Sequence, residues 1–201
     1  NEFLKLDDAP STTNYVEIAG SPGYDLSGLS VVFVPTATTW YPVPESGTIK
    51  GKIDLPPGAA LGSNGKYLIG NENLVTNYGV TADLTVSGGW KQYHYYAGLA
   101  VFLVHTAAVG LGDSVAPDFP DTSAVLDGVT LACCGEPSYF DGAVGAPQVV
   151  GGGGIVDVPG VYRLTDGATG PEVDTNTAAD WGILTRDGSP PNSPEPAAPS
   201  T

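Results

Sequence analysis

The sequence predicts an all-β protein that folds as a sandwich of antiparallel sheets. Short stretches rich in β-branched and aromatic residues recur along the chain and are separated by turn residues. Glycine (28 residues) and proline (18 residues) are abundant, which suits many turns and long loops. No segment repeats apolar residues at i, i+3, i+4 and i+7, the spacing of an amphipathic helix. About eight to ten short strands joined by turns indicate a sandwich.

Each expected strand carries a local signal. Residues 15–19 and 80–86 alternate in polarity, the period of a strand with one buried face. Residues 29–34 form a nearly continuous β-branched run, which is typical of a strand buried on both faces. Residues 99–104 are the most apolar run of the chain and should form a central strand. The expected strands are residues 1–6, 15–19, 29–34, 66–70, 80–86, 99–104, 125–132, 155–158, 161–164 and 181–185.

A few single residues have an expected place in this framework. Asn64-Gly65 is a turn dipeptide that precedes the strand at 66–70. Glu17 and Asp83 fall on alternating positions of their strands and are expected to face solvent or a sheet edge. Trp181 is expected to anchor the core or a sheet edge.

The chain is expected to form one β-sandwich domain over residues 1–187, followed by a proline-rich linker or extended arm over residues 188–201. Five of the last fourteen residues are proline, which favours an extended, polyproline-like conformation. The chain has no methionine, even at position 1, so we expect a processed or trimmed mature segment. Long loops inside compact domains are typically functional or packed against something. The long insertions are residues 35–51, 87–98, 105–123 and 133–154, and the arm is residues 188–201.

The charge of the chain restricts its partners. Lysine and arginine number 7 against 22 aspartates and glutamates, so the formal net charge is −15. No basic stripe is present, which argues against nucleic-acid binding, and an anionic membrane surface would repel the chain. No stretch approaches the roughly 20 apolar residues of a membrane-spanning helix. The acidity fits solubility in a saline medium, binding of divalent cations, or both, and solubility alone accounts for most of the carboxylates.

The two cysteines, Cys133 and Cys134, are adjacent, and no third cysteine is present. Three alternatives follow: two small buried apolar residues, a strained disulfide between neighbours, or a link between chains. An oxidising compartment would favour a disulfide. A zinc site is disfavoured, because two neighbouring thiolates supply two ligands at most and both histidines lie far away in sequence.

Short motifs at the two ends of the chain resemble those of the lamin tail domain family, as found in secreted bacterial and archaeal proteins. At the start, Leu29 stands where relatives have tryptophan. The middle of the chain matches the family only in patches, at residues 58, 67–70, 99–104 and 126–129. The matching end motifs are Asn1, Glu2, Tyr15, Glu17 and Asp25-Leu26-Ser27-Gly28, and then Arg163, Asp166-Gly167, Asp180-Trp181 and residues 188–192.

The resemblance implies an immunoglobulin-like antiparallel β-sandwich, here with long loop insertions. Such a sandwich needs roughly 100 residues, so this chain is about twice the minimum. The resemblance also implies an extracellular or cell-surface location and an adhesive or positioning role. It supplies no catalytic residues, since the family has none. In microbial relatives the domain accompanies secreted nucleases, phosphatases or surface proteins.

The residues themselves also argue against an enzyme. A nucleophilic triad needs a positioned histidine, and the two histidines are His94, in an aromatic loop, and His105, at the end of an apolar strand. The four glycines at 151–154 are not followed by Lys-Ser or Lys-Thr, so no phosphate-binding loop is present. The expectation is a non-catalytic protein.

Calcium is the expected cofactor, because it prefers oxygen ligands and acidic loops supply them. Neither acidic cluster follows the spacing of an EF-hand loop, and solvated carboxylates are the competing interpretation. We expect at least one site, because a net charge of −15 otherwise strains a compact state. The candidate ligands are Asp113, Asp118 and Asp121 in one cluster, and Asp166, Asp174 and Asp180, with Glu172, in the other.

Aromatic loops are the expected partner-binding sites. Residues 90–96 hold Trp90, Tyr93 and Tyr95, and the loop 35–51 holds Trp40 and Tyr41. Exposed tryptophan and tyrosine often anchor interfaces and stack on sugars. The alternative is a hairpin whose alternate aromatic side chains cover one sheet face.

Two functions remain in view. The first is an extracellular structural or adhesive protein that assembles with copies of itself, or with other surface proteins, on a surface or filament. The opening strand then has two interpretations, since it closes its own sheet or adds to the sheet of a neighbour. The second is a module that binds a glycan or surface polymer and accompanies a secreted hydrolase or nuclease.

Overall fold

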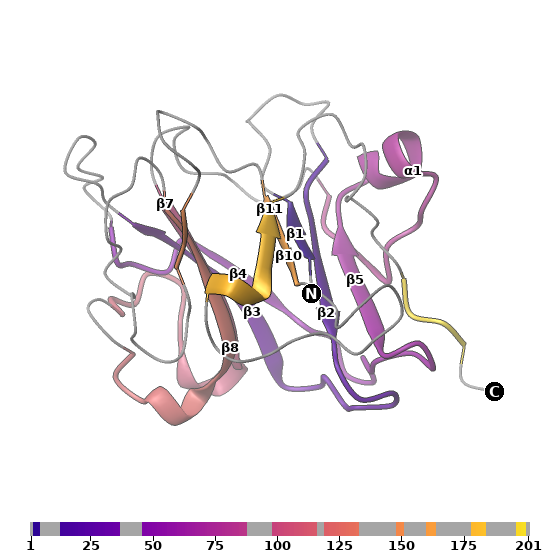
Figure 1. The fold of residues 1–201 in the computed structure, drawn as a ribbon. Coiled ribbons are helices and arrows are strands. Elements are labelled where there is room, and N and C mark those ends of the chain that lie inside the picture. The colour runs from indigo at the N-terminus through magenta and orange to yellow at the C-terminus, as the bar shows by residue number, and fades with distance from the viewer. Residues whose placement is uncertain are drawn as a thin grey trace.

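Two β-sheets pack against each other in the computed structural model of the chain, and one short α-helix lies beside them (Figure 1). The sequence-based expectation of a mostly-β sandwich is confirmed at this level. No helix in the described part of the chain is long and apolar enough to cross a membrane. The structure describes residues 2–4, 13–36, 46–87, 98–115, 119–132, 148–150, 160–163, 178–183 and 196–199.

The first sheet has six strands in the order β11-β10-β1-β2-β5-β6. The opening strand lies inside this sheet and pairs with β2 on one side and β10 on the other. Of the two interpretations of the opening strand, the structure therefore has the one in which it closes its own sheet. The strands are β1 (Glu2–Leu4), β2 (Tyr15–Ala19), β5 (Lys66–Gly70), β6 (Leu84–Thr85), β10 (Gly160–Arg163) and β11 (Trp181–Ile183).

The second sheet has five strands in the order β4-β3-β7-β8-β9. The apolar strand β7 lies at its centre, as its sequence predicts. The strands are β3 (Leu29–Thr36), β4 (Gly51–Asp54), β7 (Gly98–His105), β8 (Val125–Ala132) and β9 (Gln148–Val150).

The expectation of purely antiparallel sheets is wrong at two edges. β6 pairs with β5 in parallel, and β9 pairs with β8 in parallel. A parallel pair needs a crossover of about a dozen or more residues. Residues 71–83 and residues 133–147 provide connections of that length, so both parallel edge pairs are sterically accessible.

The main core lies between the two sheets. Alternate residues of facing strands supply it, for example Val16 and Ile18 from β2 and Val31 and Phe33 from β3. Trp181 of β11, an edge strand, is 8% exposed and belongs to this core. The tryptophan is thus both a core residue and an edge anchor, as expected.

Both outer faces carry smaller apolar clusters. On the second sheet, Val32 and Val34 of β3 pack with Val109, Val115 and Phe119 from the segment after β7. This segment covers the outer face, which explains why every residue of β3 is buried. The β-branched run therefore has two buried faces, as its composition predicts.

On the first sheet, the cover is α1 (Asn73–Tyr78). Its Leu74 packs on Tyr15 of β2 and Leu68 of β5, and the ring of Tyr78 meets that of Tyr15 edge-on at 5.8 Å. Three short 3-10 helices complete the described elements: η1 (Thr106–Ala108), η2 (Thr122–Ala124) and η3 (Ala178–Asp180).

The expected strand at 80–86 is mostly wrong, because only β6 forms there. Val80 and Ala82 pack against the cluster beneath α1, which produces the same alternation without a strand. Two strands were not predicted: β9 lies in a stretch interpreted as a loop, and β4 begins at the last residue of another, in residues to which no strand was assigned. The expected strand at 155–158 lies outside the described residues.

Glu17 does not face solvent, contrary to expectation. It is 2% exposed on the outer face of the first sheet, where its Oε1 lies 2.6 Å from the ammonium of Lys66 on β5. A cross-strand cation therefore makes burial of this carboxylate tolerable. Asp83, in contrast, is exposed beside β6 at the sheet edge, as expected.

Candidate functional site

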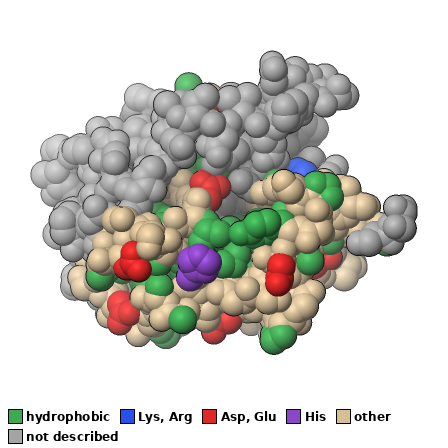
Figure 2. Space-filling model, turned by 90° about the horizontal axis from the view of Figure 1, so that it is seen from below, with side chains coloured by type: hydrophobic (Ala, Val, Ile, Leu, Met, Phe, Trp, Pro, Cys, Tyr) green, Lys and Arg blue, Asp and Glu red, His purple; other side chains and the backbone are tan. Residues whose placement is uncertain are grey.

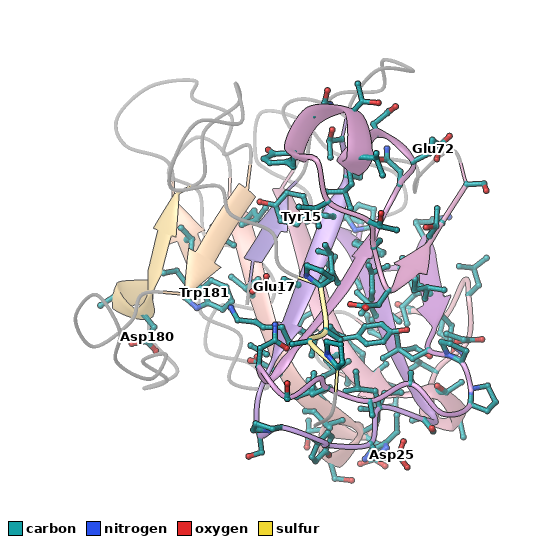
Figure 3. The ribbon with its side chains drawn as sticks, turned by 90° about the vertical axis from the view of Figure 1, so that its right-hand side faces the viewer. Tyr15, Glu17, Asp25, Glu72, Asp180 and Trp181 are labelled. Carbon is teal, nitrogen blue, oxygen red and sulfur yellow. The ribbon has the colours of Figure 1, made fainter. Side chains whose placement is uncertain are left out.

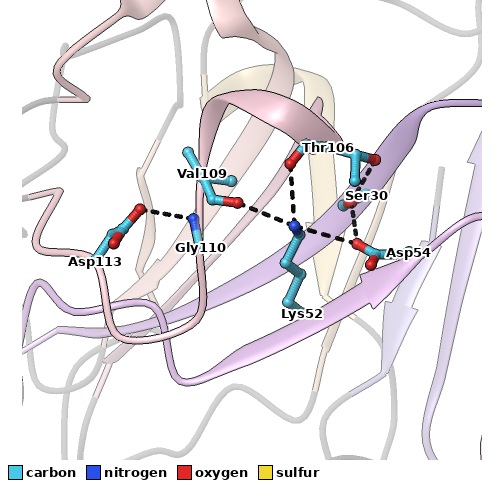
Figure 4. Close-up of polar contacts among 7 residues, drawn as sticks. All are labelled: Ser30, Lys52, Asp54, Thr106, Val109, Gly110 and Asp113. Carbon is cyan, nitrogen blue, oxygen red and sulfur yellow. Dashed lines mark hydrogen bonds and ion pairs between the residues drawn. The ribbon is translucent and has the colours of Figure 1, made fainter.

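A serine, a lysine and an aspartate meet on the outer face of the second sheet (Figure 4). Ser30 and Asp54 are directly opposed on the antiparallel pair β3–β4, and Lys52 is opposed to Val32. Alternation along a strand places residues 30, 32 and 34 on one face, so the cluster borders the apolar patch of Val32 and Val34.

The Ser30 side chain is wholly buried, and its hydroxyl proton is used in a hydrogen bond. Ser30 Oγ donates to Asp54 Oδ1 at 2.6 Å and lies 2.7 Å from Thr106 Oγ1. A hydroxyl has one proton, so Thr106 is the donor in the second contact. The Ser30 hydroxyl is therefore fixed between two neighbours, and its 0% exposure denies a substrate access to it.

The lysine is also fully engaged. Lys52 Nζ donates to the carbonyl oxygens of Thr106 at 3.0 Å and Val109 at 2.9 Å, and it lies 3.4 Å from Asp54 Oδ1. An ammonium has three protons, and these three acceptors match them. Lys52 thus holds the segment after β7 against β4 and contributes to the cover over the outer face.

The environment of Asp54 favours its ionised form. The hydrogen bond from Ser30, and to a smaller degree the positive charge of Lys52, lowers the pKa of Asp54 from its ordinary value, while partial burial acts in the opposite direction. An ionised carboxylate between a hydroxyl and an ammonium is a stabilising arrangement. The cluster as a whole anchors loops.

The Asp25-Leu26-Ser27-Gly28 motif also has a structural role. Asp25 Oδ1 accepts from the backbone N–H of Ser27 at 2.8 Å. Hydrogen bonding from the side chain of Ser27, and then from its backbone N–H, lowers the pKa of the Asp25 carboxyl. Ser27 Oγ accepts from the N–H of Gly58, and buried Leu26 bonds through its N–H to Ala59. The motif joins two loops at one end of the sandwich, where Figure 3 shows Asp25 far from Glu72.

Two of the candidate calcium ligands close local turns. Asp113 Oδ2 accepts from the N–H of Gly110 at 2.6 Å. This bond closes the turn that directly follows Val109, whose carbonyl oxygen binds Lys52. Asp121 Oδ1 accepts from both the N–H and the hydroxyl of Ser123 and so caps η2. Both aspartates are exposed.

A third candidate, Asp180, is 2% exposed and lies beside Trp181 (Figure 3). The described residues contain no group of three or more His, Cys, Asp or Glu side chains placed to hold a metal. On the face in Figure 2, acidic side chains lie apart from one another around a patch of hydrophobic side chains. Asp118, Asp166, Glu172 and Asp174 lie outside the described residues, so the calcium site stays a prediction.

The candidate partner-binding residues cannot be placed in the same way. Trp40, Tyr41, Trp90, Tyr93 and Tyr95 all lie outside the described residues, as do His94, Cys133 and Cys134. His105 ends β7 and is exposed. The aromatic-loop prediction and the three alternatives for the cysteines therefore stay open.

Sequence reasoning missed one contact surface, at the turn before β5. Residues 196–199, here called the tail segment, lie against Gly62, Ser63, Asn64 and Asp83, here called the tail site. In Figure 1 the C-terminal end lies beside β5, away from β11. The tail site thus holds a part of the chain that sequence reasoning had placed in a free linker or arm.

Hydrogen bonds to the tail backbone define this surface. The N–H of Ser63 donates to Ala198 O at 2.9 Å, and the N–H of Ala198 donates to Asn64 Oδ1 at 2.9 Å. Asn64 Nδ2 donates to Pro196 O at 2.9 Å, and Ser63 Oγ donates to Pro199 O at 2.7 Å. These hydrogen bonds therefore go to backbone atoms of the tail segment and not to its side chains.

Asp83 adds a fixed acceptor to the tail site. Its Oδ2 accepts from the N–H of Ala197 at 2.8 Å and from the N–H of Leu68, on β5, also at 2.8 Å. The bond from Leu68 positions the carboxylate through β5, independently of the tail segment. The tail segment has only two N–H groups, because its other two residues are prolines. Both of these N–H groups are hydrogen-bonded to the tail site.

The sequence carries a partial signal for this surface. Gly65 has φ 72°, as the turn at Asn64-Gly65 requires, but Gly62 has no such torsional demand. A Cβ on Gly62 would lie 2.4 Å from Ala198 N, so its lack of a side chain serves close approach of the tail. The glycine is visible in the sequence, whereas its role in the contact is visible only in the structure.

No protein-family model, curated protein or solved structure matches this chain. The resemblance to lamin tail domains therefore rests on the sequence motifs alone, those at the two ends and the patches between them.

Proposed function

We propose that this chain is a non-catalytic extracellular structural or adhesive protein, which assembles with copies of itself or with other surface proteins. In this proposal its sandwich is of the immunoglobulin-like, lamin-tail type. The two-sheet architecture and the roles of the Asp25 motif are compatible with that type.

The observation that carries the proposal is the docked tail segment. The chain holds the tail segment through five hydrogen bonds to the backbone of that segment, four of them made by side chains of the tail site. Recognition of an extended backbone at a sheet edge is a general mode of protein association. A molecule that contains both the peptide and its surface is equipped for assembly.

The polar cluster supports a non-catalytic role. Ser30, Lys52 and Asp54 are residue types that could form a nucleophilic site. Each is instead engaged in holding the loop after β7, and the serine is buried. The polar groups of this cluster therefore stabilise the fold.

Negative-stain microscopy and sedimentation velocity test the proposal. We expect ordered particles or filaments that grow with protein concentration and with salt, because salt screens the repulsion between chains of net charge −15. Monodisperse monomers at every concentration and salt level would contradict assembly. If such monomers also bound a glycan array, and Trp90→Ala and Tyr93→Ala removed that binding, the glycan-binding module would replace this proposal.

A further inference from the structure

We propose that the tail site is a peptide-binding site that accepts the tail segment of a second copy of this chain, in exchange for the chain's own. This inference rests on the proposed function, because it names the contact through which copies associate. Its ligand class is an extended, uncharged peptide in which two small residues with free N–H groups stand between prolines.

The tail site has the properties of a built site. The five hydrogen bonds satisfy both N–H groups and three carbonyl oxygens of the tail segment. Asp83 is held in place by Leu68 of β5, and Asn64 Oδ1 also accepts from the N–H of Lys66. The acceptors are thus oriented by the sheet itself, which reduces the cost of binding.

Gly62 sets the shape of the site. It is buried, and the three heavy atoms nearest to an added Cβ all belong to Ala197 and Ala198, at 2.4, 2.5 and 2.8 Å. Any side chain at position 62 would therefore meet the tail segment first. Gly62→Ala is a specific means of closing the site.

The tail site recognises the ligand by the positions of its backbone N–H groups. Prolines favour the extended conformation and remove donors, so the tail segment offers only the N–H groups of Ala197 and Ala198, and these face Asp83 and Asn64. Proline at either alanine would delete a donor. The spacing of proline and non-proline residues is therefore the recognition element.

The length of the connection permits exchange between copies as well as docking within one chain. The tail segment follows β11, at one edge of the first sheet, and docks beside β5 and β6 at the other edge. Five spacings between strands amount to about 24 Å, whereas the twelve residues 184–195 reach about 40 Å when extended. A connection longer than its span allows the same segment to reach the tail site of an adjoining copy, as in domain swapping.

A labelled synthetic peptide of residues 188–201 tests the site. The receptor is the full chain with Ala197→Pro and Ala198→Pro, whose own tail segment has lost both donors. We expect saturable binding by fluorescence anisotropy, and at least about tenfold weaker binding to the unchanged chain, because its tethered tail competes at high effective concentration. A receptor with the circular dichroism of the unchanged chain but without saturable binding would overturn the proposal.

A matched pair of alanine variants identifies the surface. Gly62→Ala in the same receptor should abolish peptide binding. Gly110→Ala should leave binding unchanged, because a Cβ at Gly110 meets its nearest atom at an ordinary 3.4 Å. Equal binding by the two variants would overturn the assignment to the tail site. If the double-proline chain does not fold, Ala198→Pro alone serves as the receptor.

Mixing two full-length variants tests exchange between copies. Gly62→Ala has an intact tail and a closed site, and the double-proline variant has an open site and a disabled tail. We expect the weight-average mass from sedimentation to rise on mixing and to stay monomeric for each alone. No rise at concentrations that saturate with peptide would overturn exchange. Ordered particles in the microscope without peptide binding would contradict this inference alone. Peptide binding without such particles would contradict the proposed function alone.

Discussion

The hydroxyl oxygen of Ser30 connects several parts of the second sheet. Ser30 has one of the two hydroxyl side chains in β3, the other being that of the terminal Thr36, and it is wholly buried. Its partner Asp54 lies on the neighbouring strand, and its second neighbour, Thr106, follows β7. One buried hydroxyl thus ties three parts of the second sheet together, because a buried hydroxyl must find partners.

Replacing Ser30 by alanine should destabilise the fold by about 1–2 kcal/mol. A hydrogen bond to a charged group is worth about 1.5–3 kcal/mol, and the exposure of Asp54 to solvent reduces that value. Urea unfolding followed by circular dichroism measures the difference. Ser21→Ala, in an exposed turn, is the control. Equal midpoints for Ser30→Ala and Ser21→Ala would show that the Ser30 contact contributes nothing.

The same pair should give the fold a distinct pH dependence. The pKa of Asp54 is lowered in the folded chain, chiefly by Ser30. Its contribution to stability is therefore complete above the unfolded pKa of about 3.9, and it is lost as the pH falls through the lowered folded pKa. The stability gap between the unchanged chain and Ser30→Ala should narrow as the pH falls from about 6 towards 3. Urea midpoints across that range test it, and a constant gap would contradict it.

Replacing Lys66 by methionine should cost about 3 kcal/mol, because it removes the ammonium 2.6 Å from the buried carboxylate of Glu17. The double variant Glu17→Gln with Lys66→Met should recover part of the loss, since no buried charge then remains. Thermal and urea unfolding of the two single variants and the double variant form a double-mutant cycle. Additive losses would mean that the two side chains are not coupled.

At the scale of elements, the sequence predicts strands whose own residues carry a pattern. Residues 15–19, 66–70 and 125–132 form strands with the expected bounds. β4 holds one buried apolar residue, Ile53, so nothing in its own sequence signals a strand, and its pairing with β3 decides the matter. The six residues of α1 are too few to show a helical period.

The tail site was beyond sequence reasoning for a similar reason. Its contacts join residues 114 to 136 positions apart and use backbone groups or common polar side chains. No local pattern reports such a contact. The balance of energies explains why the tail segment is exchangeable: five hydrogen bonds supply about 0.5–1.5 kcal/mol each, and ordering four residues costs about 1–2 kcal/mol each.

At the scale of the whole molecule, the net charge of −15 is the dominant property. Repulsion among so many carboxylates disfavours the compact state, and bound cations would relieve it. The described residues contain no group of three or more acidic, His or Cys side chains placed to hold a metal, so a calcium site would need at least one residue from outside them.

Removing calcium should lower the melting temperature if the predicted site exists. We expect a chelator to reduce the midpoint and added calcium to restore it, because a ligand that binds only the folded state stabilises it. Scanning calorimetry at constant ionic strength measures this effect, and magnesium at the same concentration is the control for general screening. An unchanged midpoint would remove calcium from the description of this protein.

The position of β1 has a consequence for the order of folding. Among the described strands, this three-residue strand links β2 to the pair β10–β11, and it joins Glu2 to Tyr162, partners 162 − 2 = 160 positions apart. A ribosome must therefore release most of the chain before that sheet can be completed. Contacts of such long range slow folding to about milliseconds or longer. Until then, the edges of β2 and β10 are both open, and the growing chain is most vulnerable to pairing with the wrong partner.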